Sequence, residues 1–369
     1  MLPLSYGNVY KTPDDYKPPD DLDFDDTEYP NLNSRDYARR PLNHTARMHE
    51  AWECLSISTT PNEAAASGNV AVCCNKLSGR EWTGTLWGFE KHNVLEDKNE
   101  AMTPGKSCFK LQCPAIINGM TFVSPNILLL AFNTGNLQVW STHSEVRKSQ
   151  NPYCLFLIGE KCEHMRPITC LSNFPSNQHK AVTGSKDGTL KIWDMGTADL
   201  VSQGSYRFAH TDSITGVSAA RGKDNIFATC SLDKSCLLWD DRETRPAIAL
   251  YENHSVRFTN VTWCPQSDDS KIYLGDEAGA VLTIDVRQPK QIETETQYFE
   301  RPIRKIIPND ENLAIISDSN LVKIAKSSTH SVFYKNSESE NFVRDGAWIT
   351  NKEFLTIGFE GKLRSHSIE

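Results

Sequence analysis

The sequence predicts an all-β chain folded as a seven-bladed β-propeller. The first observation is the stretch Thr183–Asp194, where small residues end one strand, an Asp-Gly pair makes a tight turn and alternating apolar residues begin the next. The second is that this unit recurs seven times, and the third is its Trp-Asp ending. The positions equivalent to its tryptophan are 41 to 53 residues apart: Phe89, Trp140, Trp193, Trp239, Ile284, Ala325 and His366. Such a period with a Trp-Asp ending is typical of WD repeats.

Composition excludes several classes of protein. The chain has 369 residues and is 38% hydrophobic, which is enough for one closed unit. Its net charge of -8 argues against direct binding of nucleic acid, which needs a basic face. Eleven scattered cysteines without a CxxC pair, and no signal peptide, predict reduced thiols in the cytoplasm or nucleus. No apolar run is long enough to span a membrane. No metal-ligand spacing or phosphate loop appears, so we expect neither metal nor cofactor.

Residues 1–40 differ from the rest of the chain. They hold nine acidic and five basic residues with scattered prolines, and their apolar residues follow no period. Such a segment cannot bury enough surface to offset its ordering entropy. We therefore expect a disordered acidic tail at 1–40 and the propeller at 41–369. The tail either only solvates the protein or is a short linear motif whose tyrosines anchor on a basic partner. A separate partner of the tail, such as a Tudor-domain protein, is left open.

The strands of blade one follow the tail. Trp52–Ser58 and Asn69–Leu77 are expected as its two inner strands, and Trp82–Glu90 as its third. Ser107–Cys113 is expected as the outer strand, after a polar loop. The link between the second and third strands ends in Trp82, where other blades have a small Asp-Gly turn.

The remaining blades follow at regular intervals. Blade two is expected from Ile117 to about Glu163, and blades three, four and five each begin after a histidine: His164, His210 and His254. The third strand of blade seven ends near the C-terminus. We expect Leu42–His49 to supply its outer strand, which closes the ring and leaves no sheet edge open.

Two blades carry the side chains that WD repeats join in a hydrogen-bonded tetrad. The predicted members are His164, Ser185, Asp187 and Trp193 in blade three, and His210, Ser231, Asp233 and Trp239 in blade four, with Thr183 and Thr229 as alternatives for the hydroxyl group. A histidine near an aspartate and a serine also invites a catalytic-triad interpretation. The aspartate lies in a turn, however, and the indole N–H completes an internal network. We therefore expect a structural role and no catalytic residues.

One stretch goes beyond the needs of the scaffold. It is Leu77–Phe89, LSGREWTGTLWGF, with Trp82 at a turn. A large exposed aromatic side chain is typical of an anchor at a protein interface. The alternative is that Trp82 folds back over its own blade.

A second feature is a matched pair of arginines. Arg242 follows Trp239-Asp-Asp, and Arg287 follows Ile284-Asp-Val one blade later. The pair is similar to the paired WDxR boxes of substrate receptors for cullin-RING ubiquitin ligases, although Ile284 stands where the second box has tryptophan. This suggests a ligase-adaptor interface, and the alternative is a pair of ordinary solvated arginines.

The chain resembles a known family over roughly residues 50 to 369. The stretch LSGREWTGTLWGF, with Phe342–Trp348 and Gly275–Gly279, is similar to the WD-repeat subunit of the methylosome, partner of the protein arginine methyltransferase that makes symmetric dimethylarginine. The resemblance implies a non-catalytic adaptor that forms a hetero-octamer with the methyltransferase. It also implies that the adaptor presents arginine-rich substrates such as Sm, histone or Piwi proteins. It further implies that Trp82 is the docking anchor, with Arg80 and Glu81 beside it.

Overall fold

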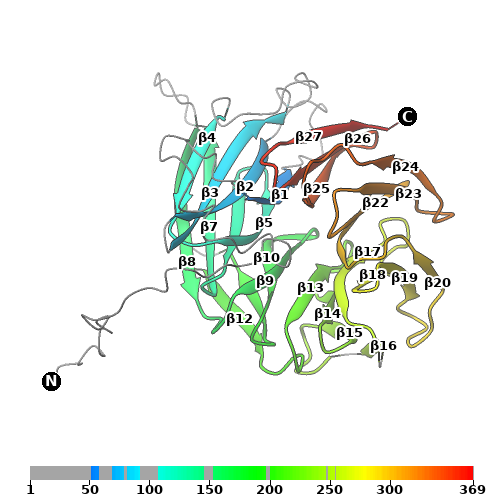
Figure 1. The fold of residues 1–369 in the computed structure, drawn as a ribbon. Coiled ribbons are helices and arrows are strands. Elements are labelled where there is room, and N and C mark those ends of the chain that lie inside the picture. The colour runs from blue at the N-terminus through cyan, green and yellow to red at the C-terminus, as the bar shows by residue number, and fades with distance from the viewer. Residues whose placement is uncertain are drawn as a thin grey trace, which may run out of the picture. The chain divides into compact units, whose positions relative to one another are not determined.

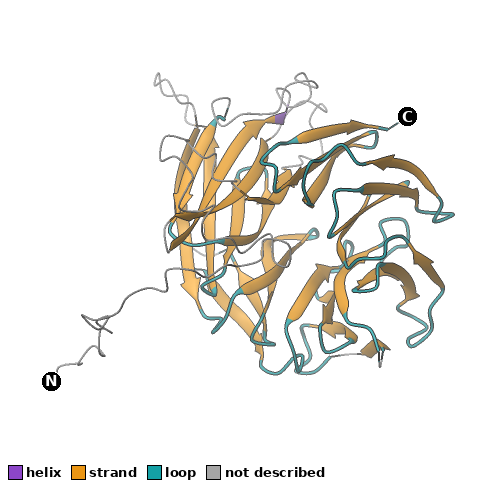
Figure 2. Ribbon diagram, in the orientation of Figure 1, coloured by secondary structure: helices purple, strands orange, loops and turns teal. Residues whose placement is uncertain are grey.

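The chain is described by a computed structural model. All the described residues lie in the unit Met48–Glu369, and nearly all of them form strands joined by loops (Figure 2). None of the described helical residues forms a segment able to cross a membrane. The expected tail at 1–40, the expected strand Leu42–His49 and His254 lie outside the described residues. The residues that the structure describes are 51–57, 69–78, 81–91, 107–144, 153–196, 200–246, 248–253 and 255–368.

The described strands form seven antiparallel sheets, and in each sheet the strands lie side by side in chain order. Blades one to three are β1 (Ala51–Ile57), β2 (Asn69–Ser78), β3 (Glu81–Glu90) and β4 (Phe109–Cys113); β5 (Ile117–Ser124), β6 (Ile127–Phe132), β7 (Asn136–Ser144) and β8 (Tyr153–Cys162); and β9 (Ile168–Phe174), β10 (Asn177–Ser185), β11 (Leu190–Asp194) and β12 (Val201–Tyr206). These sheets contain the strands that the sequence predicts for blade one.

Blades four to six also have four strands, and the described part of blade seven has three. They are β13 (Ile214–Ala219), β14 (Ile226–Ser231), β15 (Ser235–Asp240) and β16 (Ile248–Glu252); β17 (Phe258–Trp263), β18 (Lys271–Asp276), β19 (Ala280–Asp285) and β20 (Thr294–Gln297); β21 (Ile303–Pro308), β22 (Asn312–Ser317), β23 (Val322–Lys326) and β24 (Val332–Asn336); and β25 (Val343–Thr350), β26 (Glu353–Gly358) and β27 (Arg364–Ser367).

The seven sheets form a closed ring. The first strand of each sheet contacts the first strands of the sheets before and after it, and β1 contacts β25 (Figure 1). Each of the seven repeat positions from Phe89 to His366 lies on a third strand, in the same register against the second strand. The predicted seven-bladed β-propeller is therefore confirmed.

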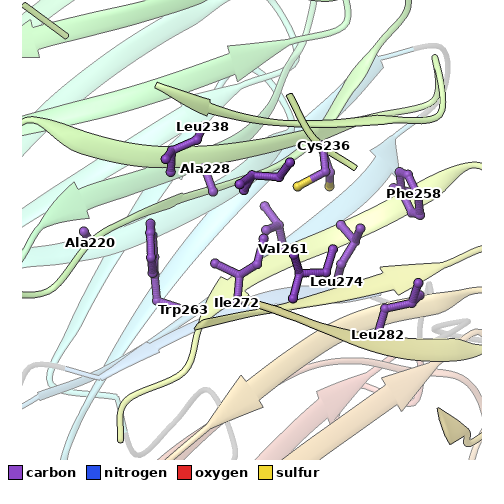
Figure 3. Close-up of a cluster of buried hydrophobic side chains, with 13 residues drawn as sticks. Ala220, Ala228, Cys236, Leu238, Phe258, Val261, Trp263, Ile272, Leu274 and Leu282 are labelled. Carbon is purple, nitrogen blue, oxygen red and sulfur yellow. The ribbon is translucent and has the colours of Figure 1, made fainter. Parts of the chain in front are cut away.

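The core lies between the blades. Buried apolar side chains form seven clusters among the described residues, and each cluster joins two neighbouring sheets. In one of them, Leu238 and Cys236 of blade four pack with Trp263, Ile272 and Leu274 of blade five (Figure 3). Because both faces of each sheet are covered, the second strands are apolar without alternation, as in a sheet buried on both sides.

The propeller has two different faces. Because the strands are antiparallel, the turns from second to third strand all lie on one face, and the connections from third to fourth strand lie on the other. Gly188 in the blade-three turn has φ +74, and a Cβ there would lie 2.7 Å from the carbonyl oxygen of His210. Glycine thus suits the turn of blade three, where it avoids this close contact. Lys234 takes the same left-handed conformation in blade four, at φ 72.

Candidate functional site

The hairpin of β2 and β3 is longer than its counterparts. In blade three the second and third strands pair as far as Leu190, three residues before Trp193. In blade one they pair without a bulge as far as Glu81, eight residues before Phe89, the equivalent of Trp193. The five additional pairs extend the hairpin by about 17 Å at the usual strand rise.

The end of this hairpin extends beyond the pairing of the other described strands of its sheet. Among the described residues, the first strand of blade one pairs with β2 as far as Asn75, where Ala51 is its first described residue, and the fourth pairs with β3 as far as Gly84. Lys76–Ser78 and Glu81–Thr83 therefore form a two-stranded ribbon, here called the arm, with no third described strand paired to it. We call the propeller face from which it projects the arm face.

The predicted anchor residues belong to this arm. Trp82 pairs with Leu77 and Glu81 pairs with Ser78, both within the strands. Trp82 is therefore a strand residue, in agreement with the expected third strand Trp82–Glu90, and the link between the strands is shorter than the expected Ser78–Trp82. Arg80 lies outside the described residues.

Side chains at the base of the arm hold it to blade two. Asn75 is buried, its amide N–H donates to the carbonyl oxygen of Ile117 at 3.0 Å, and its amide oxygen accepts the Ile117 N–H at 3.1 Å. Asn75 thus satisfies both backbone groups of Ile117 as a neighbouring strand would. Opposite Asn75, a Cβ on Gly84 would lie 2.6 Å from the carbonyl oxygen of Ala115. Only glycine permits this close approach of the two blades.

The rest of the first-blade motif packs in the core. Leu86 belongs to the cluster between blades one and two, and Trp87 and Phe89 belong to the cluster between blades one and seven. The motif therefore has two parts. Gly84–Phe89 builds the blade, and the arm lies beyond the packed part of the blade.

The predicted tetrad of blade three is a buried chain of hydrogen bonds. The indole N–H of Trp193 donates to the Thr183 hydroxyl at 2.8 Å, which is 2.8 Å from Nε2 of His164. Nδ1 of His164 lies 2.9 Å from the hydroxyl of Thr189, which donates to Asp187. Because Thr189 uses its proton on Asp187, His164 carries a proton on Nδ1 and accepts from Thr183 at Nε2. Burial lowers the pKa of His164 to about 4, so its imidazole is neutral.

The two serines predicted for the tetrads lie outside them. Ser185 donates to the carbonyl oxygen of Pro167 at 2.9 Å and accepts the N–H of Asp187 at 3.2 Å. Ser231 likewise donates to the carbonyl oxygen of Ser213 at 2.8 Å. Both serines therefore fix the turn of their blade, and the hydroxyl group of each tetrad comes from the threonine two residues earlier.

Blade four has the same network with a direct contact to the carboxylate. Trp239 donates to the hydroxyl of Thr229 at 2.8 Å, which is 2.8 Å from Nε2 of His210. Nδ1 of His210 is 2.9 Å from Asp233, which also accepts from Ser235. Burial alone would raise the pKa of Asp233, but these hydrogen bonds hold it well below its ordinary value. Every polar atom of the tetrad has a partner, and the threonine hydroxyl is fully buried.

The degenerate repeats replace this network in different ways. In blade seven, Nε2 of His366 is 2.8 Å from the Thr356 hydroxyl and its Nδ1 is 3.0 Å from the Tyr334 hydroxyl. Histidine thus replaces tryptophan as the partner of the threonine. In blade two, Trp140 donates instead to Gln138 at 2.9 Å.

The arginine pair has the same geometry in both blades. Arg242 donates from Nε and Nη2 to Asp240 at 2.8 and 2.6 Å, and Arg287 donates to Asp285 at 2.9 and 2.6 Å. Both guanidinium groups remain largely exposed. They follow third strands, so they lie on the face opposite the arm face. Hydrogen bonds from Arg287 lower the pKa of Asp285 to about 2.

No group of three His, Cys, Asp or Glu side chains within the described ranges is placed to hold a metal ion. The expectations of no metal and no cofactor remain predictions.

Comparison with known proteins decides the family. A β-propeller family model, described as the nucleolar protein 10-like N-terminal domain, matches residues 100–362. Protein valois of Drosophila melanogaster is 34% identical over the full length of both chains. The chain belongs to this propeller family and to the family of protein valois.

Other relatives of this valois-family propeller agree. Methylosome protein WDR77 of Xenopus laevis is 27% identical over 85% of this chain and 91% of the relative. The predicted resemblance to the WD-repeat subunit of the methylosome is therefore confirmed. A solved structure described as "COPII on membranes, outer coat vertex" has a TM-score of 0.68 at 13% identity, covering 86% of this chain and 84% of the other. This last likeness shows the fold alone.

Sequence reasoning missed two features of the arm face. It did not indicate that the arm extends beyond its sheet. The signal was the length of the motif, because eight residues separate Glu81 from Phe89 and the two strands pair regularly over all of them. It also did not single out Met165 and Phe208, two exposed side chains in loops that have no periodicity.

Proposed function

We propose that this valois-family propeller is a non-catalytic adaptor of a protein arginine methyltransferase complex, and that it docks on the methyltransferase through the arm. The observation that carries the proposal is the two-stranded ribbon that holds Trp82 beyond the base of blade one. The Xenopus relative named as a methylosome protein supports the same role. The adaptor and the methyltransferase form a hetero-oligomer, proposed to be a hetero-octamer, in the cytoplasm or nucleus.

The arm has the properties that a docking element needs. A ribbon with no third described strand beside it can offer backbone N–H and C=O groups to a partner, and an aromatic residue can supply an apolar anchor. Its base is held to blade two by Asn75, which reduces the entropy lost on binding. A rigid ring with a projecting element is suited to orient one protein toward another.

The buried networks support a non-catalytic role. A nucleophilic hydroxyl must reach a substrate, but Thr183 and Thr229 are fully buried and each is bonded to both a tryptophan and a histidine. The histidine, threonine and aspartate side chains therefore use their hydrogen-bonding atoms within the blade. Their proposed role is to hold the blade and its turn in place.

Substitution of the anchor tests the proposal. Burial of a tryptophan anchor contributes about 2–4 kcal/mol at an interface, so Trp82→Ala should weaken binding to the methyltransferase by about 30- to 800-fold. The melting temperature should change little. Phe333→Ala is a matched control because Phe333 is an exposed aromatic residue on the outer strand of blade six. Unchanged affinity of a folded Trp82→Ala protein would contradict docking through the arm.

The substrates are part of the same proposal. The adaptor presents arginine-rich proteins, such as Sm, histone or Piwi proteins, to the methyltransferase. The acidic residues among the first 40 increase the local concentration of these basic chains by electrostatic attraction. A Tudor-domain protein is proposed as a separate partner of this segment.

The matched arginines favour a second candidate function, that of a substrate receptor for a cullin-RING ubiquitin ligase. Arg242 and Arg287 present equivalent exposed guanidinium groups on two adjacent blades. Because they lie opposite the arm face, the two functions can be separated by mutation. The Arg242→Ala, Arg287→Ala double variant should lose a ligase adaptor and keep the methyltransferase. Failure of the unmodified protein to bind any ligase adaptor would exclude this function.

A further inference from the structure

Two large apolar side chains of the described chain are almost fully exposed. Met165 exposes 92% of its surface and Phe208 exposes 90%. Each lies in the loop that leads from the outer strand of one blade to the first strand of the next. Both loops belong to the arm face, but they are at blades three and four and not at the arm of blade one.

A single turn holds these two loops as neighbours. The backbone N–H of Met165 donates to the Asp187 carboxylate at 2.9 Å. On the other side of the same turn, the backbone N–H of His210 donates to the carbonyl oxygen of Gly188 at 3.3 Å. The loops that carry Met165 and Phe208 are therefore both bonded to the blade-three turn, through Met165 itself and through His210.

The backbone of Phe208 is strained. Its φ is 58, in the left-handed region that a bulky residue rarely adopts. Packing does not compensate for this conformation, because the side chain is exposed. A strained residue that gains nothing inside the fold points to a role in binding.

Met165 is likewise not required by the fold. In blade four the equivalent residue is Thr211, whose backbone N–H makes the same bond to Asp233 at 3.0 Å. A small polar residue therefore satisfies this position, and the exposed methionine needs another explanation.

Basic residues lie beside the two apolar residues in the chain and in the turn between their loops. Arg166, Lys186 and Arg207 are all exposed, and none forms a salt bridge within the described part of the chain. Of the nearby carboxylates, Glu163 pairs with Lys191 at 3.0 Å and Asp187 accepts hydrogen bonds from its own turn. The exposed Asp212 accepts the backbone N–H of Ser213. The two loops and the turn between them therefore carry two exposed apolar side chains and three exposed cations, against two exposed carboxylates, those of Asp212 and of Glu163, which is paired with Lys191.

We propose that this surface, formed by Met165, Arg166, Lys186, Arg207 and Phe208, docks a partner segment in which apolar residues are interspersed with Asp and Glu. The apolar residues cover Met165 and Phe208, and the acidic residues pair with the three cations. Flexible methionine and rigid phenylalanine suit such a contact. This inference does not depend on the methyltransferase proposal, because it uses other blades and a different chemistry.

The test uses the full chain and a pool of fluorescein-labelled 15-residue peptides in which Leu or Phe is separated by Asp and Glu. The control pool has Lys at every acidic position. Fluorescence anisotropy measures binding, and the ¹³C-methyl signal of Met165, one of six methionines, reports on the site itself. We expect the acidic pool to bind and shift this signal, with affinity falling as salt is raised.

Two variants separate binding from folding. Met165→Thr with Phe208→Asn installs the blade-four residue and a residue that tolerates left-handed φ, so the fold is retained and binding should fall at least tenfold. Arg166→Glu with Lys186→Glu should have an effect of the same size while leaving both apolar residues in place. The proposal is overturned by no saturable binding of the acidic pool, by equal binding of the lysine pool, by an unshifted Met165 signal, or by full binding in both folded variants.

Discussion

Removal of one buried hydroxyl group tests the account of the repeat. Thr183→Val keeps the shape of the side chain and removes the oxygen that lies 2.8 Å from both Trp193 and His164. All three side chains are buried, so water cannot replace the lost partner. An unsatisfied buried group costs about 1–3 kcal/mol, so two such groups predict a loss of about 2–6 kcal/mol in the free energy of unfolding.

Thr356→Val provides the comparison. The hydroxyl of Thr356 is hydrogen-bonded to one buried side chain, through Nε2 of His366, whereas the hydroxyl of Thr183 is bonded to two. Its removal should cost about half as much, about 1–3 kcal/mol. Guanidinium unfolding monitored by fluorescence measures both variants. If Thr183→Val costs less than Thr356→Val, or under about 1 kcal/mol, the hydrogen-bond reasoning is refuted.

Two further predictions concern pH and the acidic segment. Burial lowers the pKa of both His164 and His366 to about 4, against an ordinary value of 6.5. As the pH falls below 6.5, these histidines therefore bind a proton in the unfolded chain while they stay neutral in the folded one. Each should lower the free energy of unfolding by about 2 kcal/mol between pH 7.5 and pH 5. Urea unfolding at a series of pH values measures this loss, and a flat profile over that range would contradict it. Deletion of residues 1–40 should preserve the methyltransferase complex but slow methylation of arginine-rich substrates, more at low ionic strength than at high, because salt screens the attraction. Equal rates at every salt concentration would exclude the electrostatic role, and failure to assemble would place the segment in the fold or the interface.

The fold could be predicted from the sequence because the same unit recurs seven times. A single hairpin is ambiguous, but seven copies in one register require seven equivalent blades. The closure of the ring is clear only in three dimensions, where β1 meets β25.

The hydroxyl member of the tetrad could not be chosen from spacing alone. Thr183 and Ser185 lie two residues apart on the same face of a strand, so both fit the pattern. The pairing register separates them, since Trp193 faces Ala181 and its diagonal neighbour is Thr183. Ser185 lies two residues farther along and bonds to the turn instead.

The arm was predicted only in part. The motif indicated that Trp82 was unusual, but a turn was expected where the strands continue to pair. The strain at Phe208 was not predictable, because left-handed backbone at a bulky residue is set by the surrounding loop and not by local preference.

Site-specific photo-crosslinking at position 82 tests the central claim most directly. A benzoylphenylalanine that replaces Trp82 is irradiated in the presence of the methyltransferase, and the same group at Arg242 serves as the control on the opposite face. The account predicts a covalent product between the two proteins at position 82 and none at position 242. A product at 242 with none at 82 would contradict docking through the arm.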